Sequence, residues 1–213
     1  DREIRIFISS PFKDMQEERN NMVRIMVPKL RKICTERDVL LSCIDFVGKE
    51  IVETNLIKTF AYTYFKSRGV TEAQSEAGAT LMMCLREVDK SNVFIGMYGE
   101  RYGWCKSKSG NTSDDRLIQS AIDIAVKEFS WAGDYQDRSA TELEIEWYIF
   151  TFFRSHKNLT FFFKVLDGHS SIDQAGWFYF RDPYFIEGVP QKERSTFESE
   201  GPFEHEKVIS FFD

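Results

Sequence analysis

The acidic side chains of residues 139–146 are the strongest candidates for chemistry in this sequence. The stretch reads SATELEIE, and Glu142 and Glu144 lie at the start of an expected helix. A carboxylate in the first turn of a helix beside a ligand can stabilise a developing positive charge, as glycosidic bond cleavage requires. The stretch also fits a helix-capping box, through Ser139 with Glu142 or Thr141 with Glu144. Only one glutamate can take the capping position, so the other is left without that role.

A second stretch, residues 9–14, reads SSPFKD and follows an apolar run. It offers the hydroxyls of Ser9 and Ser10, the ammonium group of Lys13 and the free N–H groups of a helix start. Such a helix start favours an anion such as a diphosphate. The alternative is that serine and aspartate only cap the helix.

A third stretch, residues 99–104, reads GERYGW. The rings of Tyr102 and Trp104 can stack on a base or a nicotinamide ring, and Arg101 can pair with a phosphate or with Glu100. The alternative is a turn whose aromatic side chains pack as part of the core.

Composition and missing motifs exclude several classes of protein. The net charge of −6 argues against a nucleic-acid surface, and no apolar run is long enough to span a membrane. The four cysteines and three histidines lack zinc-site spacing, so we expect no metal, and the cysteines fit reduced cytosolic thiols. No phosphate-binding glycine motif and no G-x-S-x-G is present, so no P-loop, dinucleotide fingerprint or serine hydrolase is expected.

The elements that must position these residues alternate between strand and helix. Apolar runs predict strands at 4–9, 39–46, 92–98, 159–165 and 177–180, and helical periodicity predicts helices at 14–37, 71–90, 117–129 and 139–154. This order predicts an α/β fold with a doubly wound, mostly parallel, five-stranded sheet and helices on both faces. The three chemical stretches would then meet outside the carboxyl ends of the strands.

Several details of this organisation are also expected from the pattern. Met22, Met26, Leu30 and Ile33, with Val23, Val27 and Cys34 beside them, form a wide apolar face of the first helix, Pro28 kinks or splits it, and residues 17–19 form a solvated first turn. The α/β domain is expected to cover 1–183, with insertions at about 48–68 and 105–138, and 184–213 to be an extension or linker within a longer protein.

The sequence resembles one known family over most of its length. The matching pieces are IRIFISSPFKDMQEERNNM at 4–22, GVTEAQSEAGATLMMCLREVDKSNVFIGMYGERYGW at 69–104, SATELEIEW at 139–147 and FYFRDP at 178–183. This family is the TIR-like domain of unknown function at the N-termini of NACHT-type signalling proteins with WD or TPR repeats, among them telomerase-associated and nephrocystin-like proteins. The chain departs from the family pattern at 46–70 and at 105–138.

The resemblance implies a flavodoxin-like sheet in a cytoplasmic protein that self-associates through a following NACHT-type nucleotidase and carries repeat domains in the same chain. TIR enzymes cleave the nicotinamide–ribose bond of NAD with a glutamate at a helix start, for which Glu142 or Glu144 would be the counterpart. Ser9, Ser10 and Phe12 would line the NAD site. NAD would be a substrate, and no cofactor is expected. The alternatives are a non-enzymatic adaptor that binds its own kind or a partner, and a nucleotide sensor on the same sheet.

Overall fold

Parallel strands form the centre of the fold. A computed structural model describes residues 2–11, 14–45, 72–155, 175–199 and 206–207. Within this part of the chain, β1 (Arg2–Ser9), β2 (Val39–Asp45), β3 (Val93–Tyr98) and β4 (Ala175–Phe180) form a sheet in the order β2-β1-β3-β4. All neighbouring strands are parallel. The predicted α/β class and parallel sheet are confirmed, with four described strands where five were expected.

Two expected segments fall outside the described residues. They are the strand at 159–165 and the insertion at 48–68. The strand expected at 177–180 is β4, and it pairs directly with β3, with Ile95 opposite Trp177.

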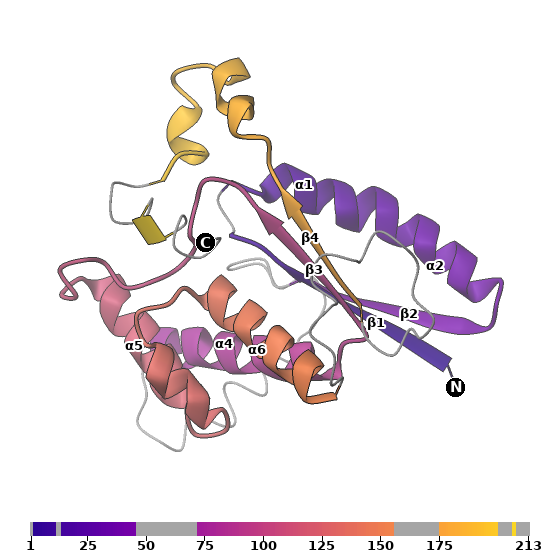
Figure 1. The fold of residues 1–213 in the computed structure, drawn as a ribbon, viewed down its shortest axis with the longest axis horizontal. Helices are drawn as coiled ribbons and strands as arrows, with labels where there is room; N and C mark the ends of the chain where they lie inside the picture. The colour runs from indigo at the N-terminus through magenta and orange to yellow at the C-terminus, as the bar shows by residue number, and fades with distance from the viewer. Residues whose placement is uncertain (1, 12–13, 46–71, 156–174, 200–205, 208–213) are drawn as a thin grey trace.

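Consecutive apolar residues of β1 are buried because helices cover both faces of the sheet. Ile6 and Ile8 face η1 (Met22–Met26) and α2 (Val27–Thr35), which follow α1 (Gln16–Asn21), whereas Phe7 faces α4 (Glu72–Lys90) and α6 (Ala140–Ser155). Figure 1 shows α1 and α2 on one side of the strands and α4, α5 (Ser113–Ala125) and α6 on the other. A second apolar core joins α4, α5 and α6 to each other.

The first helical segment differs from its prediction in a way that changes its surface. A π-helical turn, η1 (Met22–Met26), separates α1 from α2, and Pro28 lies in the first turn of α2, where it breaks no helix. Val27 is buried, with Val23 and Cys34 packed partly buried beside the same core, whereas Met26, Leu30 and Ile33 are exposed. The wide apolar face predicted for this helix is therefore buried in part only.

The helices on the other face match their sequence pattern more closely. Leu81, Cys84, Leu85 and Val88 of α4 are all buried, as the periodicity indicated. α5 begins earlier than expected because Thr112 caps it in a reciprocal capping box with its third helical residue. A 3-10 helix, η2 (Ser130–Tyr135), then leads towards α6.

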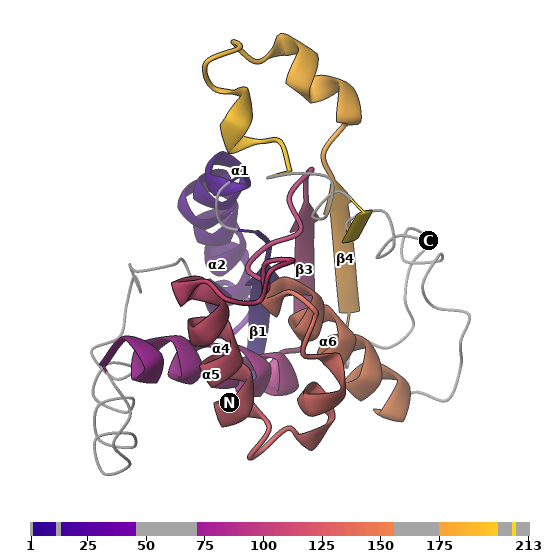
Figure 2. The ribbon, with the colours of Figure 1, turned by 90° about the vertical axis from the view of Figure 1, so that its left-hand side faces the viewer.

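The chain after β4 turns across the carboxyl ends of the strands. It contains two 3-10 helices, η4 (Pro183–Gly188) and η5 (Arg194–Thr196). Figures 1 and 2 both show this segment, in orange to yellow, beyond the tips of β3 and β4. We call residues 183–199 the C-terminal strap.

Candidate functional site

The three stretches with chemical side chains meet at the carboxyl edge of the sheet, as expected. The hydroxyl of Ser9 donates a 2.5 Å hydrogen bond to Oε2 of Glu144. The backbone N–H of Ala140 donates to the carbonyl of Trp104 at 2.9 Å. The end of β1, the loop after β3 and the start of α6 therefore form one site.

A small cavity of about 20 Å³ lies among these stretches, large enough for roughly one water molecule. Its polar wall is formed by Ser10, Arg19, Thr141 and Glu144. It is closed by Phe7, Ile8, Pro11, Trp104 and Ala140. In this conformation it does not admit a nucleotide.

Glu144 is the predicted acid that faces this cavity. Its side chain is buried, with 9% of the residue exposed, and it lines the cavity beside Ser10. On the sheet side it lies near Cys84. Burial raises the pKa of the Cys84 thiol, and the negative charge of Glu144 adds to that rise. Cys84 is therefore a protonated core thiol.

Glu142 is engaged elsewhere. Its backbone N–H donates to Oγ of Ser139 at 3.1 Å, which makes Ser139 the helix cap. Its carboxylate accepts hydrogen bonds from the Tyr102 hydroxyl and the Arg138 guanidinium. Burial, together with this carboxylate, raises the pKa of the Tyr102 phenol. Glu142, Tyr102 and Arg138 thus tie the loop after β3 to α6.

The other predicted ligand-binding residues have different surroundings. Trp104 lines the cavity. Arg101 is buried and donates to the carbonyls of Ser195 and Glu198, at 3.3 and 2.9 Å, so it holds the C-terminal strap. Phe12 and Lys13 lie outside the described residues.

Sequence reasoning missed the buried arginine of α1. Arg19 was expected in a solvated turn, but only 2% of it is exposed. Its Nη1 donates to the carbonyl of Ser10 at 3.2 Å and to Oγ of Ser10 at 2.8 Å, and it lines the cavity. The apolar spacing of the helix gives no sign of this burial, because the contact depends on the loop after β1.

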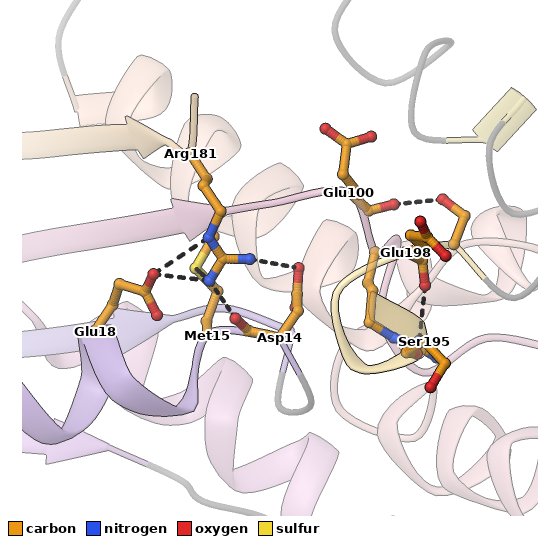
Figure 3. Close-up of polar contacts among 9 residues, drawn as sticks. Asp14, Met15, Glu18, Glu100, Arg181, Ser195 and Glu198 are labelled. Carbon is orange, nitrogen blue, oxygen red and sulfur yellow. Dashed lines mark hydrogen bonds and ion pairs between the residues drawn. The ribbon is translucent and has the colours of Figure 1, made fainter. Parts of the chain in front are cut away.

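Sequence reasoning also missed Arg181, which stands between an aromatic strand and an Asp-Pro turn. Its Nη2 donates to Oε1 of Glu18 at 2.7 Å, and its Nη1 lies 3.5 Å from Oδ2 of Asp14 (Figure 3). Its guanidinium carbon lies 4.8 Å from the ring centre of Phe185 and 5.2 Å from that of Phe197. Arg181 therefore joins the start of α1 to the strap through both ion pairs and aromatic contacts.

Asp14 is the buried acid of this second cluster. Burial raises the pKa of its carboxyl to about 6, and the positive charge of Arg181 opposes that rise. A Cβ atom at Gly99 would lie 2.3 Å from Oδ2 of Asp14 and 2.7 Å from Nη1 of Arg181. Only a glycine allows the loop after β3 to pass so close to this pair.

The described residues contain no cluster of His, Cys, Asp or Glu suited to a metal ion. Among the described helices, none has the length and apolar character needed to cross a bilayer.

The sequence pattern of one protein family matches residues 5–167, which is more than half of the chain. Its description is a domain of unknown function, DUF4062. The chain belongs to the DUF4062 family.

Two relatives show where such domains occur. A TPR repeat-containing protein of Dictyostelium discoideum is 38% identical over 208 residues, which cover 98% of this chain and 10% of the relative. Telomerase protein component 1 of the mouse is 28% identical over 201 residues, which cover 93% of this chain and 6% of the relative.

The rat telomerase protein component 1 gives a similar match, at 30% identity over 93% of this chain and 6% of the relative. The chain therefore spans a tenth or less of the curated relatives described here. No solved structure matches it significantly.

Proposed function

We propose that this DUF4062 domain is a protein-interaction module of a larger protein. The observation that carries the proposal is an exposed apolar surface along one helical segment. Ile25, Met26, Leu30 and Ile33 of η1 and α2 are between 37% and 48% exposed. Contiguous apolar side chains on a surface mark sites of protein association.

The state of the predicted site supports the same function. The carboxylate of Glu142 is held by Tyr102 and Arg138. The carboxylate of Glu144 is held by Ser9 and lines a cavity of only about 20 Å³. A closed, internally bonded site is typical of an adaptor. The relatives are long proteins, one of them named for its TPR repeats, which fits a domain that works beside others. This proposal includes a TIR-like ancestry, a flavodoxin-like topology and a cytoplasmic location. It also includes a neighbouring NACHT-type nucleotidase that would drive self-association.

The experiment is site-specific photo-crosslinking in the full-length protein. A photoreactive amino acid at Ile33 should capture another protein chain, whether a partner or a second copy. The matched control carries the same photoreactive amino acid at Arg116, which is exposed on α5 on the other side of the sheet. Capture from position 116 equal to that from position 33, or no capture from position 33, contradicts the proposal.

The second candidate function is cleavage of NAD at the nicotinamide–ribose bond, and Glu144 is the observation that favours it. This carboxylate is buried, is oriented by Ser9 and lines a cavity shared with Ser10 and Trp104. It would stabilise the positive charge that develops on the ribose. Nicotinamide leaves as a neutral group from a cationic precursor, so the site needs no strong general acid. Residues 11 and 104 would have to separate to admit NAD.

Release of free nicotinamide from NAD tests this second function. Glu144→Gln should abolish turnover, and Glu142→Gln, which alters an acid away from the cavity, serves as the comparison. If the domain releases no nicotinamide even when it is oligomerised through a fused coiled coil, the NAD hypothesis fails and the interaction module stands.

A further inference from the structure

The exposed apolar residues of η1 and α2 form a stripe with a defined spacing. Met26, Leu30 and Ile33 follow at i, i+4 and i+7, so they line one side of the helix over two turns. The stripe begins at Met26, the last residue of the π-turn. A π-turn is unfavourable compared with an α-helical turn and is often kept where a function needs it.

The stripe is surrounded by positive charge. Residues 24–38 are largely exposed and contain five basic side chains, Arg24, Lys29, Arg31, Lys32 and Arg37. The same residues contain only two acids, so their net charge is +3, whereas the whole chain carries −6. The rest of the chain therefore carries −9. None of the five basic groups forms an ion pair with another residue in the described part of the chain.

We infer that the surface formed by η1 and α2 binds an acidic amphipathic helix of another protein. This inference rests on the proposed interaction function and names the chemistry of the partner. The apolar side chains at positions i, i+4 and i+7 of this segment match the apolar face of a second helix packed against it. The surrounding lysines and arginines select a partner whose remaining face carries carboxylates.

Two other occupants fit the surface less well. A symmetric pair of copies would place the basic residues of one α2 against those of the other, and like charges oppose such a contact. A membrane-binding helix usually carries Trp or Phe on its apolar face. The segment 22–38 contains no aromatic residue, and its apolar side chains are no more than half exposed.

The probe is a synthetic helical peptide of about 20 residues, with leucines at helical spacing and glutamates elsewhere. Its binding to this chain is measured by fluorescence anisotropy. We expect it to bind at least about tenfold more tightly than a peptide of the same composition in scrambled order, because only the first presents an apolar face. Added salt should weaken the binding, since the charged contacts are at the surface. Equal affinity for the two peptides, or tighter binding of a version with lysine in place of glutamate, overturns the inference.

Variants separate the stripe from general stickiness. Leu30→Ser should weaken peptide binding about tenfold, because it removes the central anchor. Tyr184→Ser changes a more exposed apolar side chain outside the stripe and should leave binding unchanged. Lys32→Glu should weaken binding, whereas Lys192→Glu, at an exposed lysine outside α2, should not. If Leu30→Ser and Tyr184→Ser weaken peptide binding equally, or if Lys32→Glu and Lys192→Glu do, the assignment of the binding surface to η1 and α2 is contradicted.

Two further arms test the other occupants. Co-sedimentation with phosphatidylcholine–phosphatidylserine vesicles that is lost in Leu30→Ser would assign the surface to a membrane and overturn the inference. Concentration-dependent self-association that is lost in the same variant would assign it to a second copy. If crosslinks from position 33 lead to a protein segment that is neither acidic nor helical, the interaction function stands and only this inference fails.

Discussion

The hydroxyl of Ser9, at the end of β1, lies 2.5 Å from Oε2 of Glu144 in α6, although 135 positions separate the two residues. The bond joins the first strand to α6, the second α-helix after the third strand in the chain. Both partners are buried. A buried carboxylate depends on its hydrogen-bond donors, so this contact is a structural link between the two elements as well as a feature of the candidate site.

Ser9→Ala should lower the free energy of unfolding by about 1.5–3 kcal/mol, because a buried carboxylate loses a donor. Ser42→Ala is the matched control. It removes a serine–glutamate bond of 2.6 Å, to Glu3, that is exposed, and it should cost less than about 1 kcal/mol. Urea denaturation of both variants measures the difference. Equal costs would show that Ser9 contributes no more than a surface bond.

Arg181→Ala should lower the free energy of unfolding by about 3–5 kcal/mol, because it removes the main positive partner of the buried Asp14 carboxyl. Arg86→Ala removes a partly exposed pair with Glu128 and should cost less than about 1 kcal/mol. In the Arg181 variant, hydrogen exchange of the strap amides should become faster. If these amides stay as protected as in the wild type, Arg181 does not hold the strap.

The raised pKa of Asp14 makes stability depend on pH in a defined direction. The pKa of Asp14 is about 6 in the folded state and 3.8 for an ordinary exposed aspartate, so the folded state binds the proton more tightly. The stabilisation from this proton is complete below pH 3.8 and is lost as the pH rises through 6. The loss amounts to about 3 kcal/mol for a shift of this size.

The measurement is the free energy of unfolding of the wild type minus that of Asp14→Asn, followed between pH 4 and 7.5. The subtraction removes the contribution of every other titrating group. The difference should fall as the pH rises, and a difference that stays constant or grows with pH would contradict the assignment.

The burial of Val27 and the exposure of Leu30 predict unequal costs for neighbouring apolar residues of α2. Val27 is 4% exposed, and Val27→Ala should lower the free energy of unfolding by about 1–2.5 kcal/mol. Leu30 is 37% exposed, and Leu30→Ala should cost less than about 1 kcal/mol, although it removes the larger side chain. Thermal or urea unfolding of the two variants measures this. A larger cost at Leu30 than at Val27 would mean that Leu30, and not Val27, faces the core.

Local patterns in the sequence predicted the elements well where burial follows a simple period. The alternating isoleucines of β1 lie in the core on one face of the sheet, and the inward residues of α4 are buried against the sheet and against α5 and α6. The same reasoning brought the three chemical stretches to one sheet edge, because parallel strands end together. It was only partly right in the first helical segment, where Val27 is buried but Leu30 and Ile33 lie at the surface, because apolar spacing does not say which side of a wide apolar face packs on the sheet.

The sequence by itself determined the α/β class, the parallel sheet and the membership of the DUF4062 family, because these depend on periodicity and on local motifs. It could not divide the roles of Glu142 and Glu144, which have the same chemistry two positions apart. Only the tertiary structure decided that Glu142 faces Tyr102 and Arg138 while Glu144 faces Ser9 and the cavity. The physical reason is that burial, ion pairing and exposure depend on which distant segments come into contact, and no short-range spacing records those contacts.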